Sequence, residues 1–502
     1  MNRGSCGLIL TLAAMMLVGC QHSNDISPRA KARNVILFVG GGMSTTTVVA
    51  SRIRAGQLEG RSGEESWLSF EQFPHVGLSK TYNVDAQIAD SAGTMTAMMT
   101  GVKTDAGLIG VGEASVRGDC ESARDNALLS ALQLAELAGM QTGVVTTARL
   151  THATPAATFA VSPERDWESD ADMPATAKAA GCIDIAAQFV DFESALESRI
   201  PGADIDGIEI ALGGGRDKFA SGGDRKDGRD LTREWQQAYP GGVYVTDRAA
   251  LESIPALSSH VLGLFASSHL DYQAALSARS AAPSLSEMTR FAVERLSHSE
   301  TGFLLIVEGG RIDHAHHAGN AYAALTETIE LANAVSIADE MTQDEDTLII
   351  VTADHSHTIT MTGYPPRGNP ILGKVPVPGR EVSQMAFDQK PYTTLSYANG
   401  RGPYPSASAG STNPDVRYRE PVTMGRVDLS EVDTTAPGFH QEALVPLESE
   451  TRAGDDVAIY AKGPGGALVR GVLEQHLIFH AINHSLDLVN RATEAVNESG
   501  VP

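Results

Sequence analysis

The sequence predicts an α/β fold in which helices cover both faces of a central, mostly parallel β-sheet. Short and continuously apolar runs, such as residues 35–39 and 348–351, are typical of strands that are buried on both faces. Segments with helical periodicity, such as residues 321–341, lie between these runs. Strands that alternate with helices favour parallel pairing, because the crossover helices then cover the sheet.

The first expected strand, residues 35–39, ends at three consecutive glycines, Gly40, Gly41 and Gly42. Glycines after a first strand can form a phosphate cradle, but their spacing matches neither nucleotide-binding fingerprint. A tight turn that brings backbone close to a site is the better interpretation. Ser91 follows this turn, and the pattern of residues 95–104 just after it predicts a helix.

The remaining elements continue the same alternation. Ser284 and Glu287 form a capping box before a helix with one apolar stripe. Core-like pattern resumes at residues 456–460 after a long irregular stretch. The other expected elements are helices over 125–138, 321–341 and 472–490, and strands over 143–146, 208–212, 302–307 and 348–351.

The chain is expected to form one large domain over residues 33–495. Residues from about 363 to about 450 are rich in proline, glycine and short polar runs with little periodicity. This region reads as a loop-rich insertion rather than as core.

The composition argues against two classes of partner. The formal net charge is -24, whereas nucleic acids and anionic membrane surfaces require a basic footprint. A small anionic substrate would therefore need a locally positive site, such as one that contains bound metal.

Residues 1–19 have the layout of a secretory signal, with Arg3 before a short apolar stretch. The following Cys20 completes a tetrapeptide that resembles the lipobox of bacterial lipoproteins, in which the cysteine is lipidated. Gln21 then favours sorting to the outer membrane, and residues 20–32 form a flexible tether. The alternative is an ordinary signal peptide with an incidental cysteine.

Two cysteines, Cys120 and Cys182, remain once the leader and Cys20 are set aside. An even pair in an oxidising compartment favours a disulfide bond. Two buried thiols are the alternative.

Candidate catalytic groups follow the expected strands. Ser91, preceded by Asp90 and followed by small residues, can be a nucleophile if a base or a metal ion activates its hydroxyl. Oxygen and imidazole donors of the kind that zinc and magnesium use recur along the chain. These donors are Thr154, Glu308, Asp313, His317, Asp354 and His355.

Each donor alone has an ordinary structural interpretation. Asp354 and His355 could be a cap and a surface ring, and Asp313 and His317 could be a salt-bridged helix face. Most of them nevertheless come just after strands of one predicted sheet. Open parallel sheets bind ligands at the carboxyl ends of their strands, which favours a common site.

Several ordered motifs extend over most of residues 33–490. They are residues 90–97 (DSAGTMTA), 100–104 (TGVKT), 144–147 (VVTT), 152–156 (HATPA), 169–172 (SDAD), 307–313 (VEGGRID) and 352–357 (TADHSH). Through these motifs the sequence resembles the alkaline phosphatase family.

The resemblance implies a role for each matching residue. Ser91 would form a phosphoserine, and Arg165 would clamp the phosphoryl oxygens. Asp354 and His355 would hold one zinc ion, Asp313 and His317 a second zinc ion, and Thr154 and Glu308 a magnesium ion. Asp90, His152 and His357 would support these groups, Cys120 and Cys182 would form a disulfide, and the protein would be a homodimer.

Two positions depart from the family pattern. Gly41 stands where the family has the aspartate that bridges zinc and magnesium, and Arg452 stands where it has a zinc-ligating histidine. Each change adds one positive charge, and together they match the charge of one zinc ion. We therefore expect fewer than three metal ions, with Arg452 as a fixed cation that binds phosphate.

The expected function is that of an exported phosphate monoester hydrolase that acts on a phosphorylated small molecule. The main alternative is a catalytically degenerate homologue that binds phosphate or a phosphorylated ligand with little turnover, which Gly41 and Arg452 favour. Transfer with a different substrate, such as a diester or a sulfate, is a third possibility.

Overall fold

The computed structural model describes residues 31–255, 258–277, 280–403, 415 and 425–498. The expected signal peptide, Cys20 and most of the expected tether lie outside these residues. Within the described ranges, we find no helix with the length and apolar character needed to span a bilayer.

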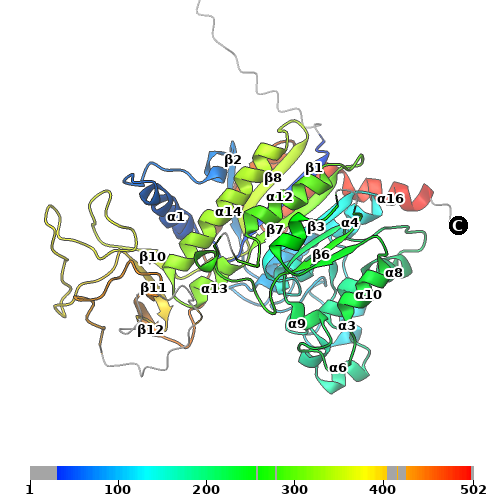
Figure 1. Ribbon diagram of the computed structural model, residues 1–502, viewed down its shortest axis with the longest axis horizontal. Helices are drawn as coiled ribbons and strands as arrows, with labels where there is room; N and C mark the ends of the chain where they lie inside the picture. The colour runs from blue at the N-terminus through cyan, green and yellow to red at the C-terminus, as the bar shows by residue number, and fades with distance from the viewer. Residues whose placement is uncertain (1–30, 256–257, 278–279, 404–414, 416–424, 499–502) are drawn as a thin grey trace, which may run out of the picture.

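A ten-stranded sheet forms the centre of the molecule (Figure 1). Its strand order is β15-β2-β14-β8-β1-β7-β3-β4-β6-β5, and only β14 runs antiparallel to its neighbours. The predicted mostly parallel sheet is therefore confirmed. Its strands are β1 (Asn34–Gly40), β2 (His75–Lys80), β3 (Gln141–Arg149), β4 (Ile210–Gly214), β5 (Val243–Val245), β6 (Val261–Leu264), β7 (Phe303–Gly309), β8 (Thr347–Ala353), β14 (Val457–Lys462) and β15 (Gly471–Glu474).

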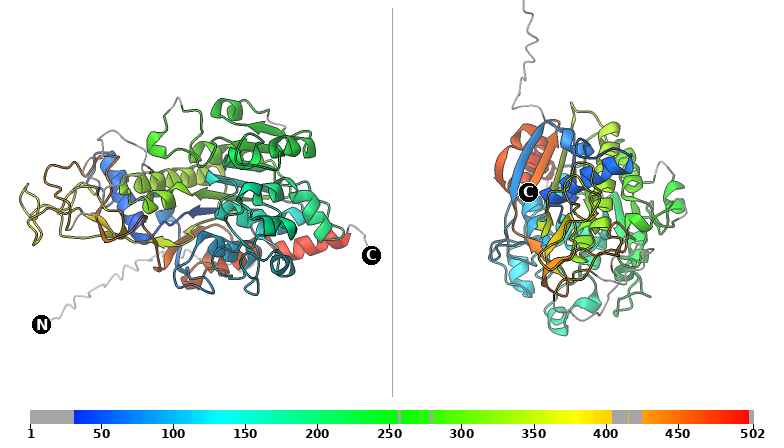
Figure 2. Two further views of the ribbon diagram at one scale, coloured as in Figure 1. Left: turned by 90° about the horizontal axis from the view of Figure 1, so that it is seen from below. Right: turned by 90° about the vertical axis from the view of Figure 1, so that its left-hand side faces the viewer.

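Helices cover both faces of this sheet (Figure 2). Alternate residues of β1 separate the two cores, since Val35 and Leu37 pack with α2, α4 and α15, whereas Ile36 and Phe38 pack with α12 and α14. The helices are α1 (Thr45–Leu58), α2 (Ser91–Thr100), α3 (Cys120–Asp125), α4 (Ala131–Leu137), α5 (Ala153–Phe159), α6 (Ala175–Ala179), α7 (Ile185–Val190), α8 (Phe192–Arg199), α9 (Arg216–Phe219), α10 (Leu231–Ala238), α11 (Arg248–Glu252), α12 (Leu285–Leu296), α13 (Arg311–His317), α14 (Ala321–Met341), α15 (Leu477–Leu486) and α16 (Leu488–Glu498).

Two small sheets lie outside the central one. The first joins β10 (Ile359–Met361), β11 (Leu395–Gly400) and β12 (Ala443–Pro446), and the second joins β9 (Ser356–His357) to β13 (Arg452–Ala453). The β9–β13 pair places Arg452 directly opposite His357. It therefore connects the segment after the loop-rich region to the end of β8.

Three expected helices have different bounds. The helix expected over 125–138 begins only at Ala131, because Ser130 and Gln133 form a capping box there. The helix expected over 95–104 begins at Ser91 and ends at Thr100, where Gly101 adopts a left-handed conformation (φ 77°). The closing helix expected over 472–490 was wrong at its start, because residues 471–474 pair with β2 as β15, and α15 and α16 follow.

The structure pairs Cys120 with Cys182 in a disulfide bond, with their Cα atoms 5.5 Å apart. The bond joins the start of α3 to the segment after α6. Both cysteines pack with Trp167, Met173 and Ala177 in a small apolar cluster. A cross-link over a sequence separation of 62 residues stabilises this outlying part of the chain chiefly by restricting the unfolded state.

A buried carboxyl pair beside β3 makes stability depend on pH. Burial raises the pKa of Glu136 to about 8 and raises the pKa of Glu209 well above its usual range. Because the folded chain then holds protons that the unfolded chain releases, stability falls as pH rises from the unfolded pKa, about 4.3, through about 8. We expect Glu136→Gln to flatten the fall in melting temperature between about pH 6 and pH 9. Thermal melts across that range test this, with the exposed Glu345→Gln as control; an unchanged slope in Glu136→Gln would contradict it.

Candidate active site

The site lies at the carboxyl edge of the central sheet. Gly40 at the end of β1 is in register with Gly309 of β7 and Ala353 of β8. The residues that follow these strands therefore meet at one edge, as open parallel sheets require. They are Gly41 and Gly42 after β1, α13 after β7, and Asp354 and His355 after β8.

Ser91 is the first residue of α2 and is buried. The preceding Asp90 caps the helix, since its carboxylate accepts a hydrogen bond from Gly93 N (3.0 Å). The Cβ that a larger residue would carry at position 93 would lie 2.7 Å from Asn83 Oδ1, so the small residue lets Asn83 hydrogen bond to Asp90. The sequence thus fixes the serine at a helix N-terminus, where backbone N–H groups favour anions.

Arg165 is held beside this serine by an ion pair with Asp90. The distance from Arg165 Nη1 to Asp90 Oδ2 is 2.8 Å, and Arg165 Nη2 lies 3.4 Å from His152 Nε2. Burial alone would raise the pKa of Asp90, but Arg165 and the capped N–H group lower it to about 2. Asp90 therefore stays ionised and positions the guanidinium.

The Ser91 hydroxyl contacts two site residues. Its Oγ lies 3.2 Å from His355 Nε2, and Arg452 Nη2 lies 3.4 Å away on β13. The Nδ1 atom of His355 donates to the Ser356 carbonyl (3.2 Å), so Nε2 carries the lone pair that faces the serine. Burial holds the pKa of His355 well below its usual value, and the ring is therefore neutral.

Asp313 on α13 lies at the centre of a group of basic side chains. Its Oδ1 atom is 2.8 Å from His357 Nε2, 3.5 Å from His317 Nε2 and 3.6 Å from His355 Nε2. Arg452 Nε lies 3.7 Å from the same oxygen. The predicted candidates from β8, α13 and β13 therefore converge on one carboxylate.

Two further candidate pairs lie at this edge. Asp354 Oδ1 accepts from Gly42 N (2.8 Å), while its buried Oδ2 receives no hydrogen bond in the described part of the chain and lies 3.2 Å from His355 Nε2. Glu308 is the penultimate residue of β7 and accepts a hydrogen bond from the Thr146 hydroxyl. The buried Thr154 hydroxyl on α5 likewise lacks a partner among the described residues. Such unpaired buried oxygens fit a site that receives a cation.

Burial raises the pKa of Glu308 to about 7, with help from the neighbouring carboxylates of Asp354 and Asp313. Burial would lower the pKa of His357, but Glu450 and Asp313 raise it to about 9. The imidazole of His357 is therefore held between two carboxylates.

Three residues at this edge were missed in the sequence. Glu450 accepts from His357 Nδ1 (2.5 Å) and is held by the backbone N–H and hydroxyl of Thr358 (2.7 Å each). The rings of His269 and His314 contact each other at a tilt, and each meets the His152 ring edge-on. Glu450 could have been found from its place two residues before Arg452, whereas no local pattern marks His269.

Gly41 and Gly42 differ in what they tolerate. A Cβ at Gly42 would overlap the His357 ring, and the residue has φ +64°, whereas a Cβ at Gly41 would lie 3.3 Å from Asp313 Cβ without positive φ. We expect Gly42→Ala to lose about 1–2 kcal/mol of stability from its backbone conformation alone, because side chains disfavour this region. Gly41→Ala is the matched control and should change stability little. Denaturant unfolding measures both, and equal losses would contradict this account.

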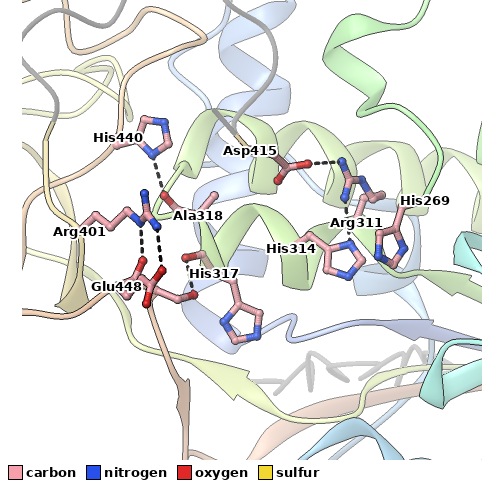
Figure 3. Close-up of a pocket in the computed structure, with 10 residues that line it drawn as sticks. His269, Arg311, His314, His317, Ala318, Arg401, Asp415, His440 and Glu448 are labelled. Atoms are coloured by element: carbon pink, nitrogen blue, oxygen red, sulfur yellow. Dashed lines mark hydrogen bonds and ion pairs between the residues drawn. The ribbon is translucent and has the colours of Figure 1, made fainter. Parts of the chain in front are cut away.

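A cavity of about 520 Å³ opens beside His317 (Figure 3). Arg311 on its wall is paired with Asp415 (2.9 Å) and stacks on the Tyr272 ring. Arg401 on the wall contacts Glu448. Charged and imidazole side chains thus line a cavity next to the phosphate-binding candidates. It is lined by His269, Arg311, His314, His317, Ala318, Arg401, Asp415, His440, Glu448 and Ser449.

Comparison with protein families gives one match over most of the chain. The sequence profile described as "Alkaline phosphatase" matches residues 32–488. The chain is 42% identical over 472 residues to the alkaline phosphatase of Gadus morhua, and the match covers 91% of this chain and 92% of that protein. It is 41% identical over 472 residues to the tissue-nonspecific alkaline phosphatase of Gallus gallus, over 90% of this chain and 84% of that protein.

Solved structures share the fold. The alkaline phosphatase of Thermus thermophilus superposes with a TM-score of 0.64 at 23% identity, over 94% of this chain and 96% of that one. That of the Antarctic bacterium TAB5 superposes with a TM-score of 0.60 at 21% identity, over 91% and 99%. At these identities, the likeness supports the arrangement of the sheet and its helices.

Proposed function

The chain belongs to the alkaline phosphatase family, and from this premise we propose that it hydrolyses phosphate monoesters through a phosphoserine at Ser91. The observation that carries the proposal is the position of Ser91 Oγ, 3.2 Å from His355 Nε2 and 3.4 Å from Arg452 Nη2. A nucleophile, a lone pair facing its hydroxyl and a fixed cation therefore meet at one point.

The residues of this chain divide the reaction between them. Arg165 and Arg452 bind the phosphoryl oxygens, and the N-terminus of α2 adds backbone donors. Ser91 Oγ attacks phosphorus and loses its proton, the ester P–O bond breaks, and the leaving alcohol oxygen takes up a proton. Water then attacks the phosphoserine, and the Ser91 O–P bond breaks to release phosphate.

Metal ions of the family would be held by three pairs of residues. Asp354 and His355 would hold zinc beside Ser91, Asp313 and His317 a second zinc, and Thr154 and Glu308 magnesium. A bound zinc ion lowers the pKa of an adjacent hydroxyl or water and stabilises negative charge on oxygen. Gly41 and Arg452 deprive these pairs of further ligands, so we propose fewer than three ions per chain.

Arg452 contributes a charge but cannot activate water. Its guanidinium stays protonated and suits the geometry of phosphate oxygens. We therefore propose that Ser91 is phosphorylated readily and that release of phosphate from it is slow.

A second candidate function follows from the same two positions. With Gly41 and Arg452 in place, a degenerate homologue would bind phosphate or a phosphorylated ligand with little turnover. Arg452 supports this candidate because its Nη2 atom already contacts the Ser91 hydroxyl, beside which the phosphate would bind.

Hydrolysis of p-nitrophenyl phosphate, with added zinc and magnesium, separates the two candidates. Measurable turnover that rises with added zinc supports the hydrolase. Binding of inorganic phosphate by calorimetry without turnover supports the degenerate homologue. Neither binding nor turnover overturns both.

Location and assembly complete the proposal. We propose that the chain is exported, lipidated at Cys20 and anchored to the bacterial outer membrane by residues 20–32, and that it forms a homodimer. The domain spans residues 33–495, and the loop-rich insertion at about 363–450 contributes to substrate choice. Arg401, on the wall of the cavity beside His317, comes from this insertion.

A further inference from the structure

Three histidines of the site share an orientation that is typical of metal ligands. In each ring the Nδ1 atom faces a protein oxygen. These oxygens are the Glu450 carboxylate for His357 (2.5 Å), the Glu450 carbonyl for His317 (2.7 Å) and the Ser356 carbonyl for His355 (3.2 Å). Metal-binding histidines usually donate their other ring N–H to an oxygen in this way. The three Nε2 atoms are thus directed toward Asp313.

The distances between ligand atoms favour one set of three metal ligands among these groups. Ligand atoms of Asp313, His355 and His357 all lie within 4.8 Å of one another and are buried. In a tetrahedral zinc shell with bonds of about 2.0–2.1 Å, neighbouring ligand atoms are about 3.3 Å apart. The Asp313 Oδ1 atom lies 2.8 Å and 3.6 Å from the two Nε2 atoms, which brackets that spacing.

A second set, His317, His357 and Glu450, fits less well. There His317 Nδ1 donates to the Glu450 carbonyl, and His357 Nδ1 contacts the Glu450 carboxylate. An ion at this place would have to break both contacts. In the first set, only the proton between His357 Nε2 and Asp313 has to be displaced, and it leaves to solvent when the ion binds.

We propose that, in place of the two zinc ions that the family pattern would give to the Asp354–His355 and Asp313–His317 pairs, this chain holds one divalent ion through Asp313, His355 and His357, so that His357 becomes a metal ligand. The inference rests on the proposed function for its link to Ser91, whose Oγ lies 3.2 Å from His355 Nε2. His357 then supplies a ligand at a site whose family set is left incomplete by Gly41 and Arg452.

The local charge supports a single ion. Asp313, Asp354 and Glu450 are the carboxylates nearest the three imidazoles, and Arg452 is the cation beside Asp313. Once the ion has displaced the His357 proton, the three rings are neutral and one divalent ion balances these four side chains, so a second would leave excess positive charge. The fixed charge of Arg452, 3.7 Å from Asp313 Oδ1, also disfavours a second ion at that carboxylate.

The absence of a side chain at Gly42 leaves space for the His357 ring. The ring lies where a side chain at position 42 would be, since a Cβ there would overlap its Nε2 and Cδ2 atoms. The Glu450 carboxylate is fixed in turn by Thr358 and by the β9–β13 pair. His357, the third proposed ligand, is therefore held in position by the backbone at Gly42 and by buried hydrogen bonds.

The cobalt(II) form of the full mature chain tests the ligand set directly. Metal analysis after dialysis should give one Co²⁺ per chain. Proton NMR should show two exchangeable, paramagnetically shifted imidazole N–H signals, one for each ligating histidine. His357→Gln should remove one signal or the ion itself, whereas the matched His317→Gln should keep the ion and both signals.

One further variant and a folding control separate loss of a ligand from loss of the fold. Glu450→Gln should keep both signals and weaken Co²⁺ binding about 10–100-fold, as loss of a supporting group does. Circular dichroism melts verify that each variant folds. Loss of the ion in His317→Gln with retention in His357→Gln, or no retained Co²⁺ in the parent, would overturn the inference. Metal retention without turnover of p-nitrophenyl phosphate would instead count against the proposed hydrolase alone.

Discussion

Replacing Ser91 with alanine is expected to reduce hydrolysis of p-nitrophenyl phosphate at least about a thousandfold. The reason is that the variant lacks the oxygen that forms the phosphoserine, and loss of a nucleophile removes the covalent route. Stopped assays with zinc and magnesium present measure the effect. Because the Ser91→Ala variant keeps the start of α2 and its Asp90 cap, the fold should be unchanged.

Thr94→Ser is the matched control for this variant. Thr94 lies on the same helix, and its hydroxyl donates to the Asp90 carbonyl (2.8 Å), which serine can also do. The control should retain the parent rate within a fewfold. Equal rates in Ser91→Ala and the parent would show that another group is the nucleophile.

Restoring both family residues, Gly41→Asp together with Arg452→His, is expected to raise steady-state turnover by about a hundredfold or more. The new carboxylate and imidazole supply ligands for further ions, and groups of this kind typically change rates by that factor. A Cβ at position 41 would make a tight contact with Asp313 Cβ (3.3 Å), which a shift of a few tenths of an ångström relieves. Metal analysis should show more ions per chain than in the parent.

The single variants separate the two effects. Arg452→His alone removes the fixed cation and should weaken binding of inorganic phosphate, whereas Gly41→Asp alone should not remove that contact. If the double variant gains metal but no rate, slow phosphate release has another cause than these two positions. If the parent already holds three tightly bound ions, the proposed loss of metal is wrong.

The sequence predicted the sheet because its strands carry the signal within themselves. Residues 35–39 and 348–351 are continuously apolar, and both are central strands of the parallel sheet. The segment over 472–490 was misread because β15 depends on pairing with β2, which lies almost 400 residues earlier in the chain. Local periodicity contains no information on such a partner.

The candidate site likewise combines residues that local sequence motifs predict with residues that only the tertiary structure brings in. Ser91, Asp313, Asp354 and His355 stand in recognisable motifs next to strands or helix starts, and the fold brings them together. Glu450 stands two residues before Arg452, but its contact with His357 is visible only in the tertiary structure, next to the β9–β13 pair. The contacts of Arg452 with Ser91 and Asp313 likewise required the tertiary structure.

The central claim is that Ser91 accepts phosphate faster than it releases it. Rapid-quench mixing of the parent protein with p-nitrophenyl phosphate, followed by peptide mapping, measures both steps. The account predicts a burst of nitrophenol that approaches one equivalent per chain, a slow steady phase, and phosphate on Ser91 in the quenched protein. Linear nitrophenol release without a burst, or phosphate on a residue other than Ser91, would contradict it.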